Sequence, residues 1–408
     1  PARRTQLAAP AATMLALTLL ASTVDASSST WPTVDCGSLL RDDLAPRTAA
    51  LDDLRDAIVT RGFFYCAGVG ELFNESYIAS MYDFSRRAHA LPPAVKRRHS
   101  RPHGGYTGPD AGVLGNVHEL GKQPSLRAWD YSREPNAFVA AQCAGSPASA
   151  GGSGGGDEGG GSGKYPGPEL LSPRFEDVVG DLYDRQQTLA AALLEAIGEV
   201  LGLPPDAFTR HLADGELGTV RLMRYPPASE AAARNISGVG GGDGVGGGGD
   251  GVGGGGPHVG IGAHTDYEAL TLMHQSAEGL ELRDVSGRWA VAPVRPDAFV
   301  VILGDVLERM TNGVLRATPH RVPLDGAGGG ERYSIIRFCA LAAHTRIAPM
   351  EEFVTPESPA LYSATTMEEH LRVTVENLLA GRGAWDSETD ASATATYDHA
   401  AARSRDEL

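Results

Sequence analysis

Cysteine is scarce in this chain, and its few copies lie far apart. The four residues are Cys36, Cys66, Cys143 and Cys339, and no two of them form a Cys-X-X-Cys pair. Neither a zinc knuckle nor a dithiol redox motif is therefore indicated. An oxidising compartment would still allow disulfides, and Cys36 with Cys66 is the first pairing to test, because both residues end neighbouring predicted strands.

A basic surplus and long apolar runs are also missing. The 35 Lys and Arg residues are outnumbered by 51 Asp and Glu residues, which gives a formal net charge of −16. Binding to nucleic-acid phosphates requires clustered positive charge, so nucleic acid is not an expected partner. The apolar stretch at 7–21 is short and rich in alanine, whereas a membrane span needs about 20 strongly apolar residues. No stable span is expected in the mature chain.

The two ends of the sequence resemble targeting signals. Early arginines, the apolar stretch and the small residues after it have the layout of a signal peptide over 1–26. The last four residues are Arg405, Asp406, Glu407 and Leu408, which differ from the Lys-Asp-Glu-Leu retrieval signal in one basic residue. We therefore expect the endoplasmic-reticulum lumen or the secretory pathway, with a retrieval receptor as a partner. Another organelle or the cytoplasm is the alternative.

Glycine, in contrast, is abundant, with 52 residues concentrated in two segments. Residues 145–163 and 238–256 consist mainly of glycine with small or acidic residues. Such segments bury too little apolar surface to offset the entropy lost on ordering, so both are predicted to be flexible insertions. The second segment lacks the flanking strand and helix of a dinucleotide loop, and it lacks the nine-residue period of calcium-binding repeats.

Outside these insertions, helical periodicity is followed by a series of short strands. Helices are predicted over 75–90 and 175–203, and the Gly- and Pro-rich stretch 101–117 is predicted to be a loop. Strands are predicted at 63–66, 219–225, 270–274, 280–283, 299–303, 321–324 and 333–341. This pattern predicts a mainly β fold with flanking α-helices, built on a double-stranded β-helix, or jelly roll.

His264, Asp266 and His320 form a metal-ligand pattern within this β-rich part. Side chains at i and i+2 of a strand share one face, so His264 and Asp266 are expected to bind one ion, with His320 completing the set. Two imidazoles and one carboxylate leave coordination positions open, which is typical of non-haem Fe(II) oxygenases. Zinc is the alternative metal, but it would leave these open coordination positions unused.

Arg332 and Ser334 form a second pattern, twelve residues after His320. The planar guanidinium pairs bidentately with a carboxylate, and Ser334 at i+2 adds a donor on the same face of the strand. We expect this pair to bind the far end of a dicarboxylate beside the metal.

These residues lie in segments that resemble the isopenicillin N synthase-like branch of the Fe(II)/2-oxoglutarate dioxygenases. The matching segments include Gly-Ala-His-Thr-Asp-Tyr at 262–267, Gly-Leu-Glu-Leu at 279–282, Thr-Asn-Gly at 311–313, Thr-Pro-His-Arg-Val at 318–322 and Arg-Tyr-Ser at 332–334. The resemblance implies an N-terminal dioxygenase region at 31–144 and a jelly-roll catalytic core at 164–350 that contains the insertion 238–256. Residues 351–408 are expected to form a C-terminal helical extension and tail.

The family's site residues carry over onto matching positions. The resemblance implies that His264, Asp266 and His320 bind Fe(II) and are the catalytic residues. It implies that Arg332 and Ser334 bind 2-oxoglutarate and that Tyr225 contacts the same co-substrate.

Two positions depart from the family pattern. Met223 stands where plant members commonly have Asn, and Arg337 replaces an apolar or small residue. Strand alternation turns Arg337 away from the face of Arg332 and makes Ile336 and Phe338 the better pocket candidates. His118, His258, His274 and His344 have no supporting spacing and are expected to be structural.

The resemblance implies an enzyme that oxidises an unactivated C–H bond of a small organic substrate with O₂ and 2-oxoglutarate. Hydroxylation is the expected outcome, with succinate and CO₂ released and ascorbate as a reductant. One alternative is an oxidase similar to isopenicillin N synthase or aminocyclopropane-carboxylate oxidase, which does not use 2-oxoglutarate. The others are a non-catalytic ligand-binding protein of the same fold and a lumenal hydroxylase of protein side chains.

Overall fold

The computed structural model describes most of the chain between residues 31 and 392. The described ranges are 31–41, 44–100, 104–108, 126–133, 164–212, 215–227, 230, 261–284, 287–323, 330–379, 385–386 and 391–392. The predicted signal peptide, both glycine-rich insertions and the terminal tetrapeptide lie outside these ranges, as do Cys143, His118 and His258.

One large sheet of eight strands organises the fold. Its strand order is β1-β2-β10-β7-β12-β5-β4-β3. The strands are β1 (Thr33–Asp35), β2 (Phe63–Ala67), β3 (Gly105–Thr107), β4 (Arg127–Tyr131), β5 (Thr219–Tyr225), β7 (Leu270–Gln275), β10 (Phe299–Leu303) and β12 (Arg332–Cys339). Every neighbouring pair is antiparallel except β1 with β2, which is parallel.

A smaller sheet faces the large one. It has the order β6-β11-β8-β9, with β6 (Ile261–His264), β8 (Glu281–Arg283), β9 (Trp289–Val291) and β11 (His320–Val322). Between the two sheets lies an apolar cluster that includes Met273, Ile302 and Ile336 from the large sheet and Leu282 and Val322 from the smaller one. Two facing sheets that share a core are the predicted jelly roll, and the prediction is confirmed.

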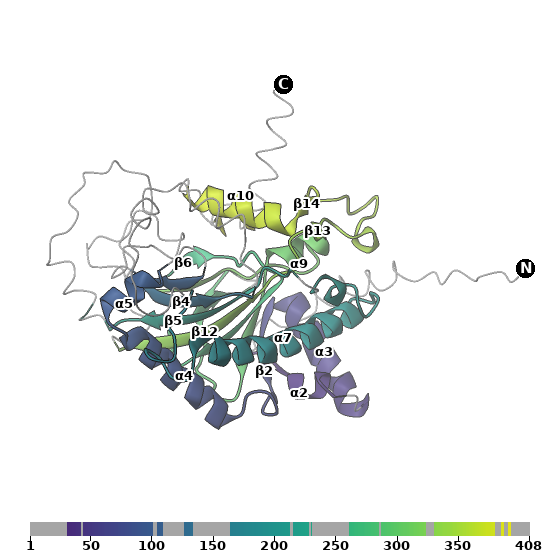
Figure 1. Cartoon of the computed structure of the whole chain (residues 1–408). Coiled ribbons are helices and arrows are strands. Elements are labelled where there is room, and N and C mark those ends of the chain that lie inside the picture. Colours follow the sequence, from purple (N-terminus) through teal and green to yellow (C-terminus); the bar gives the residue numbers. More distant parts are fainter. Residues whose placement is uncertain are drawn as a thin grey trace, which may run out of the picture.

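Helices surround the two sheets, and several of them cover the other face of the large sheet. They are α2 (Cys36–Leu39), α3 (Leu44–Thr60), α4 (Glu75–Ala90), α5 (Pro93–Arg98), α7 (Phe175–Val200), α9 (Asp305–Met310) and α10 (Met367–Leu379), with short 3-10 helices at Thr209–His211 and Glu351–Phe353. In Figure 1, α3, α4 and α7 lie together on one side of the large sheet, and β6 and α10 lie on the opposite side. The helices therefore leave the inner face of the jelly roll to the smaller sheet.

Local sequence sets the ends of α4. The Asn74 side chain accepts a hydrogen bond from the backbone N–H of Tyr77, which caps the helix. Leu91 ends the helix with a ψ of 145°, because it precedes Pro92 and a residue before proline disfavours the helical conformation. The helix predicted at 75–90 is confirmed at both ends.

The longest helix, α7, is amphipathic and packs against the sheet. Its buried residues include Leu182, Leu189, Leu193 and Ile197, which recur at helical spacing. Full burial of each such side chain stabilises the fold by roughly 1.5–3 kcal/mol. The helix ends at Val200, three residues earlier than predicted, and Gly202 follows with a φ of 72°.

A disulfide joins Cys36 to Cys66 at the edge of the large sheet, with 5.4 Å between the two Cα atoms. The parallel pairing of β1 with β2 brings the two residues together, because Val34 is the partner of Cys66. The predicted pairing is confirmed. Cys339 is buried and carries a free thiol.

The structure corrects the predicted loop at 101–117. Residues 105–107 form β3, which pairs with β4 at the edge of the large sheet. Neither strand was visible in the sequence, since glycine and charged residues interrupt any apolar run there.

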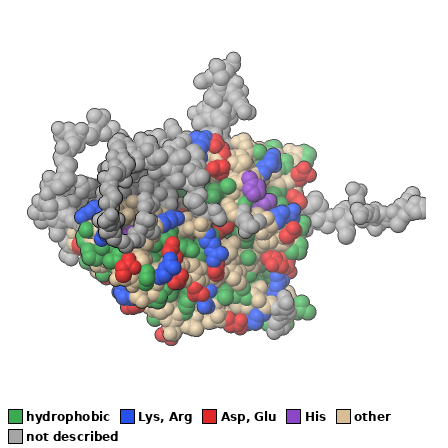
Figure 2. Space-filling view, viewed as in Figure 1, with side chains coloured by type: hydrophobic (Ala, Val, Ile, Leu, Met, Phe, Trp, Pro, Cys, Tyr) green, Lys and Arg blue, Asp and Glu red, His purple; other side chains and the backbone are tan. Residues whose placement is uncertain are grey.

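The visible surface carries charges of both signs. Figure 2 shows acidic and basic side chains interspersed over this face. Ion pairs such as Arg87–Asp83 and Arg185–Asp181 form along the helices. Among the described helices, none is both long and apolar enough to cross a membrane.

Candidate functional site

The smaller sheet brings the three predicted metal ligands together. His264 ends β6, His320 begins β11, and the two residues are direct partners in the antiparallel pairing. One Asp266 oxygen, Oδ1, lies 3.7 Å from Nε2 of His264 and 3.5 Å from Nε2 of His320. All three side chains are buried, and their ligand atoms lie within 4.8 Å of one another. This spacing lets one ion contact all three.

Asp266 reaches this position differently from the prediction. The strand β6 ends at His264, so Asp266 lies in the following turn and strand alternation does not place it. Instead, the hydroxyl of Thr271 on β7 donates a 2.5 Å hydrogen bond to Oδ2 of Asp266. The backbone carbonyl of Asp266 also accepts from the N–H of Asp305. The carboxylate is therefore oriented by the neighbouring large sheet.

Both histidines are held in one tautomer by the backbone. Nδ1 of His264 lies 2.8 Å from the carbonyl of Gly262, and Nδ1 of His320 lies 3.0 Å from the carbonyl of Thr318. A carbonyl only accepts, so each Nδ1 carries the proton and each Nε2 presents a lone pair to the centre of the triad. Burial lowers the pKa of His264 to about 4, which keeps this imidazole neutral at pH 7.

Arg332 and Ser334 lie on the inner face of β12 and are both fully buried, at 0 % exposure. Nε of Arg332 donates to the carbonyl of Ala277 at 3.1 Å, and Nη2 donates to Oε1 of Gln275 at 3.0 Å. Within the described residues, Nη1 of Arg332 and Oγ of Ser334 have no hydrogen-bond partner. Two buried donors without acceptors are costly unless a ligand supplies the acceptor.

Tyr225 lies beside this pair, as predicted for a residue that contacts the co-substrate. It is the direct partner of Arg332 in the pairing of β5 with β12, and its ring lies 4.5 Å from Cζ of Arg332. Met223 is the partner of Ser334, so a thioether fills the position that carries Asn in plant relatives. The co-substrate roles of Tyr225, Arg332 and Ser334 stay predictions.

Comparison with known proteins agrees with this geometry. Residues 250–341 match the model of the 2OG-Fe(II) oxygenase superfamily. The chain is 34% identical over 208 residues to gibberellin 2-beta-dioxygenase 2 of Oryza sativa subsp. japonica, covering 49% of this chain and 53% of the relative. It is 27% identical over 351 residues to the 2-oxoglutarate-dependent dioxygenase citB of Monascus ruber, covering 85% of this chain and 94% of the relative.

The fold agrees as well. A full-length Neurospora crassa protein, solved in complex with alpha-KG and 5-formyluracil, superposes with a TM-score of 0.63 at 20% identity, over 88% of this chain and 98% of that one. The chain is therefore similar to the Fe(II)/2-oxoglutarate-dependent dioxygenases in sequence, and residues 250–341 match the superfamily model. The resemblance found in the sequence is confirmed. The chain spans about half the length of the rice relative, whose substrate does not transfer with the family.

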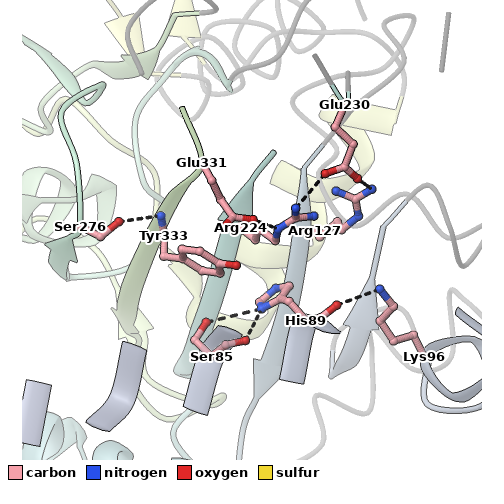
Figure 3. Close-up of polar contacts among 9 residues, drawn as sticks. All are labelled: Ser85, His89, Lys96, Arg127, Arg224, Glu230, Ser276, Glu331 and Tyr333. Carbon is pink, nitrogen blue, oxygen red and sulfur yellow. Dashed lines mark hydrogen bonds and ion pairs between the residues drawn. The ribbon is translucent and has the colours of Figure 1, made fainter. Parts of the chain in front are cut away.

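Ion pairs form on the reverse side of the large sheet, behind Tyr225 and Arg332. Arg224, next to Tyr225, donates to Glu331, next to Arg332, at 2.6 Å, and also to Glu230 at 2.8 Å. Arg127 of β4 reaches Glu230 at 2.6 Å. Figure 3 shows Arg127, Arg224, Glu230 and Glu331 linking the ends of β4, β5 and β12. The bridge fixes the register that sets Tyr225 against Arg332.

Arg337 faces away from the candidate site, as the sequence predicted. It is fully buried on the helix side of β12, where it pairs with Glu216 and also donates to Gln187 of α7. Its guanidinium lies 4.0 Å from the ring centre of Tyr183. This residue therefore joins sheet and helix and does not contact the metal centre.

Ile336 and Phe338 share the inner face with Arg332, also as predicted. Sequence reasoning missed two further residues on this face, Arg221 of β5 and Asp130 of β4, which form an ion pair. Counting back by twos from Tyr225 would have placed Arg221 on the inner face, but no signal in the sequence linked it to Asp130.

Two of the histidines that the sequence predicted to be structural, His274 and His344, lie in the described part of the chain. His274 donates from Nε2 to the carbonyl of Pro296 at 3.2 Å and accepts at Nδ1 from the hydroxyl of Tyr82 at 2.7 Å. His344 is exposed. Neither residue belongs to the metal-ligand group.

Proposed function

We propose that this dioxygenase uses Fe(II), 2-oxoglutarate and O₂ to oxidise a C–H bond of a small organic substrate, with hydroxylation as the outcome. The overall reaction converts the substrate, 2-oxoglutarate and O₂ into the hydroxylated product, succinate and CO₂. The observation that carries the proposal is the pair of buried, unpartnered donors of Arg332 and Ser334 on the strand face that also borders the triad. Their position fits a dicarboxylate that reaches the metal with its other end.

The residues present fit an iron ion. Two imidazoles and one carboxylate match the donor set of non-haem Fe(II) oxygenases, and they leave positions open for co-substrate and O₂. When bound, the iron supplies oxygen activation, which permits attack on an unactivated C–H bond. His264, Asp266 and His320 would hold the ion, and Thr271 keeps the carboxylate of Asp266 in place.

The chain's own contribution is binding, orientation and exclusion of water. Nη1 of Arg332 and Oγ of Ser334 would donate to the distal carboxylate of 2-oxoglutarate, while the Tyr225 ring packs against the guanidinium. Apolar side chains such as Met273 and Ile336 lie in the buried cluster between the two sheets. Exclusion of water by apolar side chains limits oxidation that is not directed at the substrate.

Succinate release measures this function directly. Purified protein is assayed with Fe(II), 2-oxoglutarate, O₂ and ascorbate, with each component omitted in turn and with a metal chelator added. The proposal expects slow succinate release without substrate and faster release with a substrate, both abolished by the chelator. Substrate oxidation without succinate would support the oxidase alternative, and neither activity would support a non-catalytic binding protein. Release stimulated only by peptides would support the hydroxylase of protein side chains.

We infer separately that the protein works in the lumen of the secretory pathway. The Cys36–Cys66 disulfide supports this location, since disulfides persist in oxidising compartments. The terminal Arg-Asp-Glu-Leu sequence supports recognition by a retrieval receptor. Imaging of the protein in cells, with an internal tag and with or without residues 405–408, tests both points. Cytoplasmic signal overturns the location, and an unchanged distribution after truncation overturns the retrieval.

A further inference from the structure

Arg221 projects into the jelly roll beside the metal centre. It alternates with Met223 and Tyr225 along β5, and its partner on β12 is Ile336, so it shares the inner face with the co-substrate anchor. Neither the proposed metal site nor the proposed co-substrate site uses the charge of Arg221. A guanidinium is always protonated, so its presence inside the barrel calls for an explanation.

Asp130 binds one edge of the Arg221 guanidinium. The two residues are direct partners on β4 and β5, and Nε and Nη2 of Arg221 donate to Oδ1 and Oδ2 of Asp130 at 2.7 Å and 2.9 Å. The Asp130 side chain is 3 % exposed, and that of Arg221 is 16 % exposed. Both carboxylate oxygens of Asp130 are therefore engaged by Arg221, and the guanidinium is fixed in a plane.

Phe338 sets the second constraint and links Arg221 to the metal site. Cζ of Arg221 lies 5.4 Å from the ring centre of Phe338. Across the next strand, Phe338 is the partner of Thr271, the residue that holds Asp266. Arg221 thus stands one side chain away from the residue that orients a metal ligand, toward the end of β5 opposite Tyr225.

The guanidinium retains donors that Asp130 does not use. Arginine has five N–H groups, and Asp130 takes two of them. The others have no hydrogen-bond partner among the described residues. The unused edge of Arg221 presents Nη1 and Nη2 side by side, which matches the two oxygens of a carboxylate.

We propose that Arg221, held by Asp130 and Phe338, orients the substrate of this dioxygenase, and that the substrate is a small organic acid whose carboxylate binds the unused edge of the guanidinium. This inference rests on the proposed function. The acid would be held at one end by Arg221 while another carbon of the same molecule faces the metal centre. Glu268 also lies within electrostatic reach of Arg221 and would favour a cationic substrate instead, so amines are the informative comparison.

A fractionated metabolite extract tests the substrate class. The extract is separated by ion exchange into anionic, neutral and cationic pools, and each pool is added to wild-type enzyme at saturating Fe(II) and 2-oxoglutarate. The anionic pool should raise succinate release above the rate without substrate, and methyl esterification of that pool should remove the stimulation. Both measurements use the unmodified protein, so they do not depend on the folding of a variant.

Arg221→Met then tests the residue. Loss of two charge-assisted hydrogen bonds should lower kcat/KM for the stimulating acid by about 10- to 100-fold. Arg221→Lys should recover only part of this loss, because a point charge does not replace the planar fork. The matched control is Arg210→Met, which removes an arginine from an exposed pair with Asp206 and should leave kcat/KM unchanged.

The outcomes separate the two levels of the proposal. Stimulation only by the neutral or cationic pool, or by no pool, overturns the organic-acid assignment when succinate release without substrate is present. Stimulation that survives esterification, or an unchanged kcat/KM in Arg221→Met, also overturns it. Absence of any iron-dependent succinate release would instead overturn the proposed function on which this inference rests.

Discussion

Arg332 and Ser334 stand two residues apart on one face of β12, and each buries a side-chain polar atom that no described residue pairs. Buried polar atoms are normally paired, so two such atoms side by side indicate the position of a ligand. The other donors of Arg332 are already fixed by Gln275 and the carbonyl of Ala277. The geometry therefore exists before the co-substrate binds.

Arg332→Ala should weaken 2-oxoglutarate binding without loss of iron. Removal of the bidentate, charged donor is expected to raise the KM for 2-oxoglutarate by about 10- to 100-fold. Succinate release at varied 2-oxoglutarate gives this KM, and metal titration of the same variant gives the iron affinity. The control is Ser276→Ala, because Ser276 accepts a hydrogen bond from the Tyr333 N–H outside the unpartnered pair. An unchanged 2-oxoglutarate requirement in Arg332→Ala would favour the oxidase alternative.

His264→Ala or His320→Ala should abolish Fe(II)-dependent turnover. Each substitution removes one of three ligand atoms that lie within 4.8 Å of one another, and the remaining two provide a weaker, more open site. Succinate release and metal content after dialysis are the measurements. His344→Ala, at an exposed position outside this group, should retain both. Full turnover in either ligand variant would contradict the assignment of the triad.

Glu216→Gln should destabilise the fold through the helix side of β12. Arg337 is fully buried, and the loss of its charged partner leaves an uncompensated cation, which typically costs about 3–5 kcal/mol. The free energy of unfolding in urea measures the effect. Asp206→Asn, which breaks the exposed pair with Arg210, should cost at most about 1 kcal/mol. Equal effects in the two variants would show that the Arg337–Glu216 pair contributes little.

Stability should fall as the pH drops below about 6.5. Burial lowers the pKa of His89 and of His370 to about 3 in the folded protein, whereas an unfolded histidine titrates near 6.5. Between these values the unfolded chain binds more protons, so the stabilisation is fully present above pH 6.5 and is lost as the pH falls toward 3. Each histidine contributes a slope of at most about 1.4 kcal/mol per pH unit.

Variants at these histidines test the pH dependence. His89 donates to the carbonyl of Ser85 at the end of α4 (Figure 3), and His370 of α10 donates to the carbonyl of Tyr267. His370→Asn should reduce the slope of unfolding free energy against pH between 6 and 4, measured by urea unfolding. Arg210→Gln changes surface charge without removing a histidine and should keep the slope. The same slope in His370→Asn and the wild type would refute this origin of the pH dependence.

Local periodicity in the sequence determined the jelly-roll class and most of the site. The alternation of Arg332 and Ser334 depends only on the two-residue repeat of a strand, and α4 is bounded by a cap and a proline that can be read directly. The metal ligands were found from their spacing and from the segments around them. The roles of these ligands follow from their residue types, which can be read directly from the sequence.

Tertiary structure decided the residues whose position depends on strand register. Asp266 lies beyond its strand and is oriented by Thr271, and Arg221 meets Asp130 across a gap of 91 residues. Register between distant strands follows from the packing of both sheet faces, which no local pattern contains. The sequence by itself therefore determined which groups are candidates for binding the metal and co-substrate, and the three-dimensional arrangement alone brought Arg221 and Asp130 together.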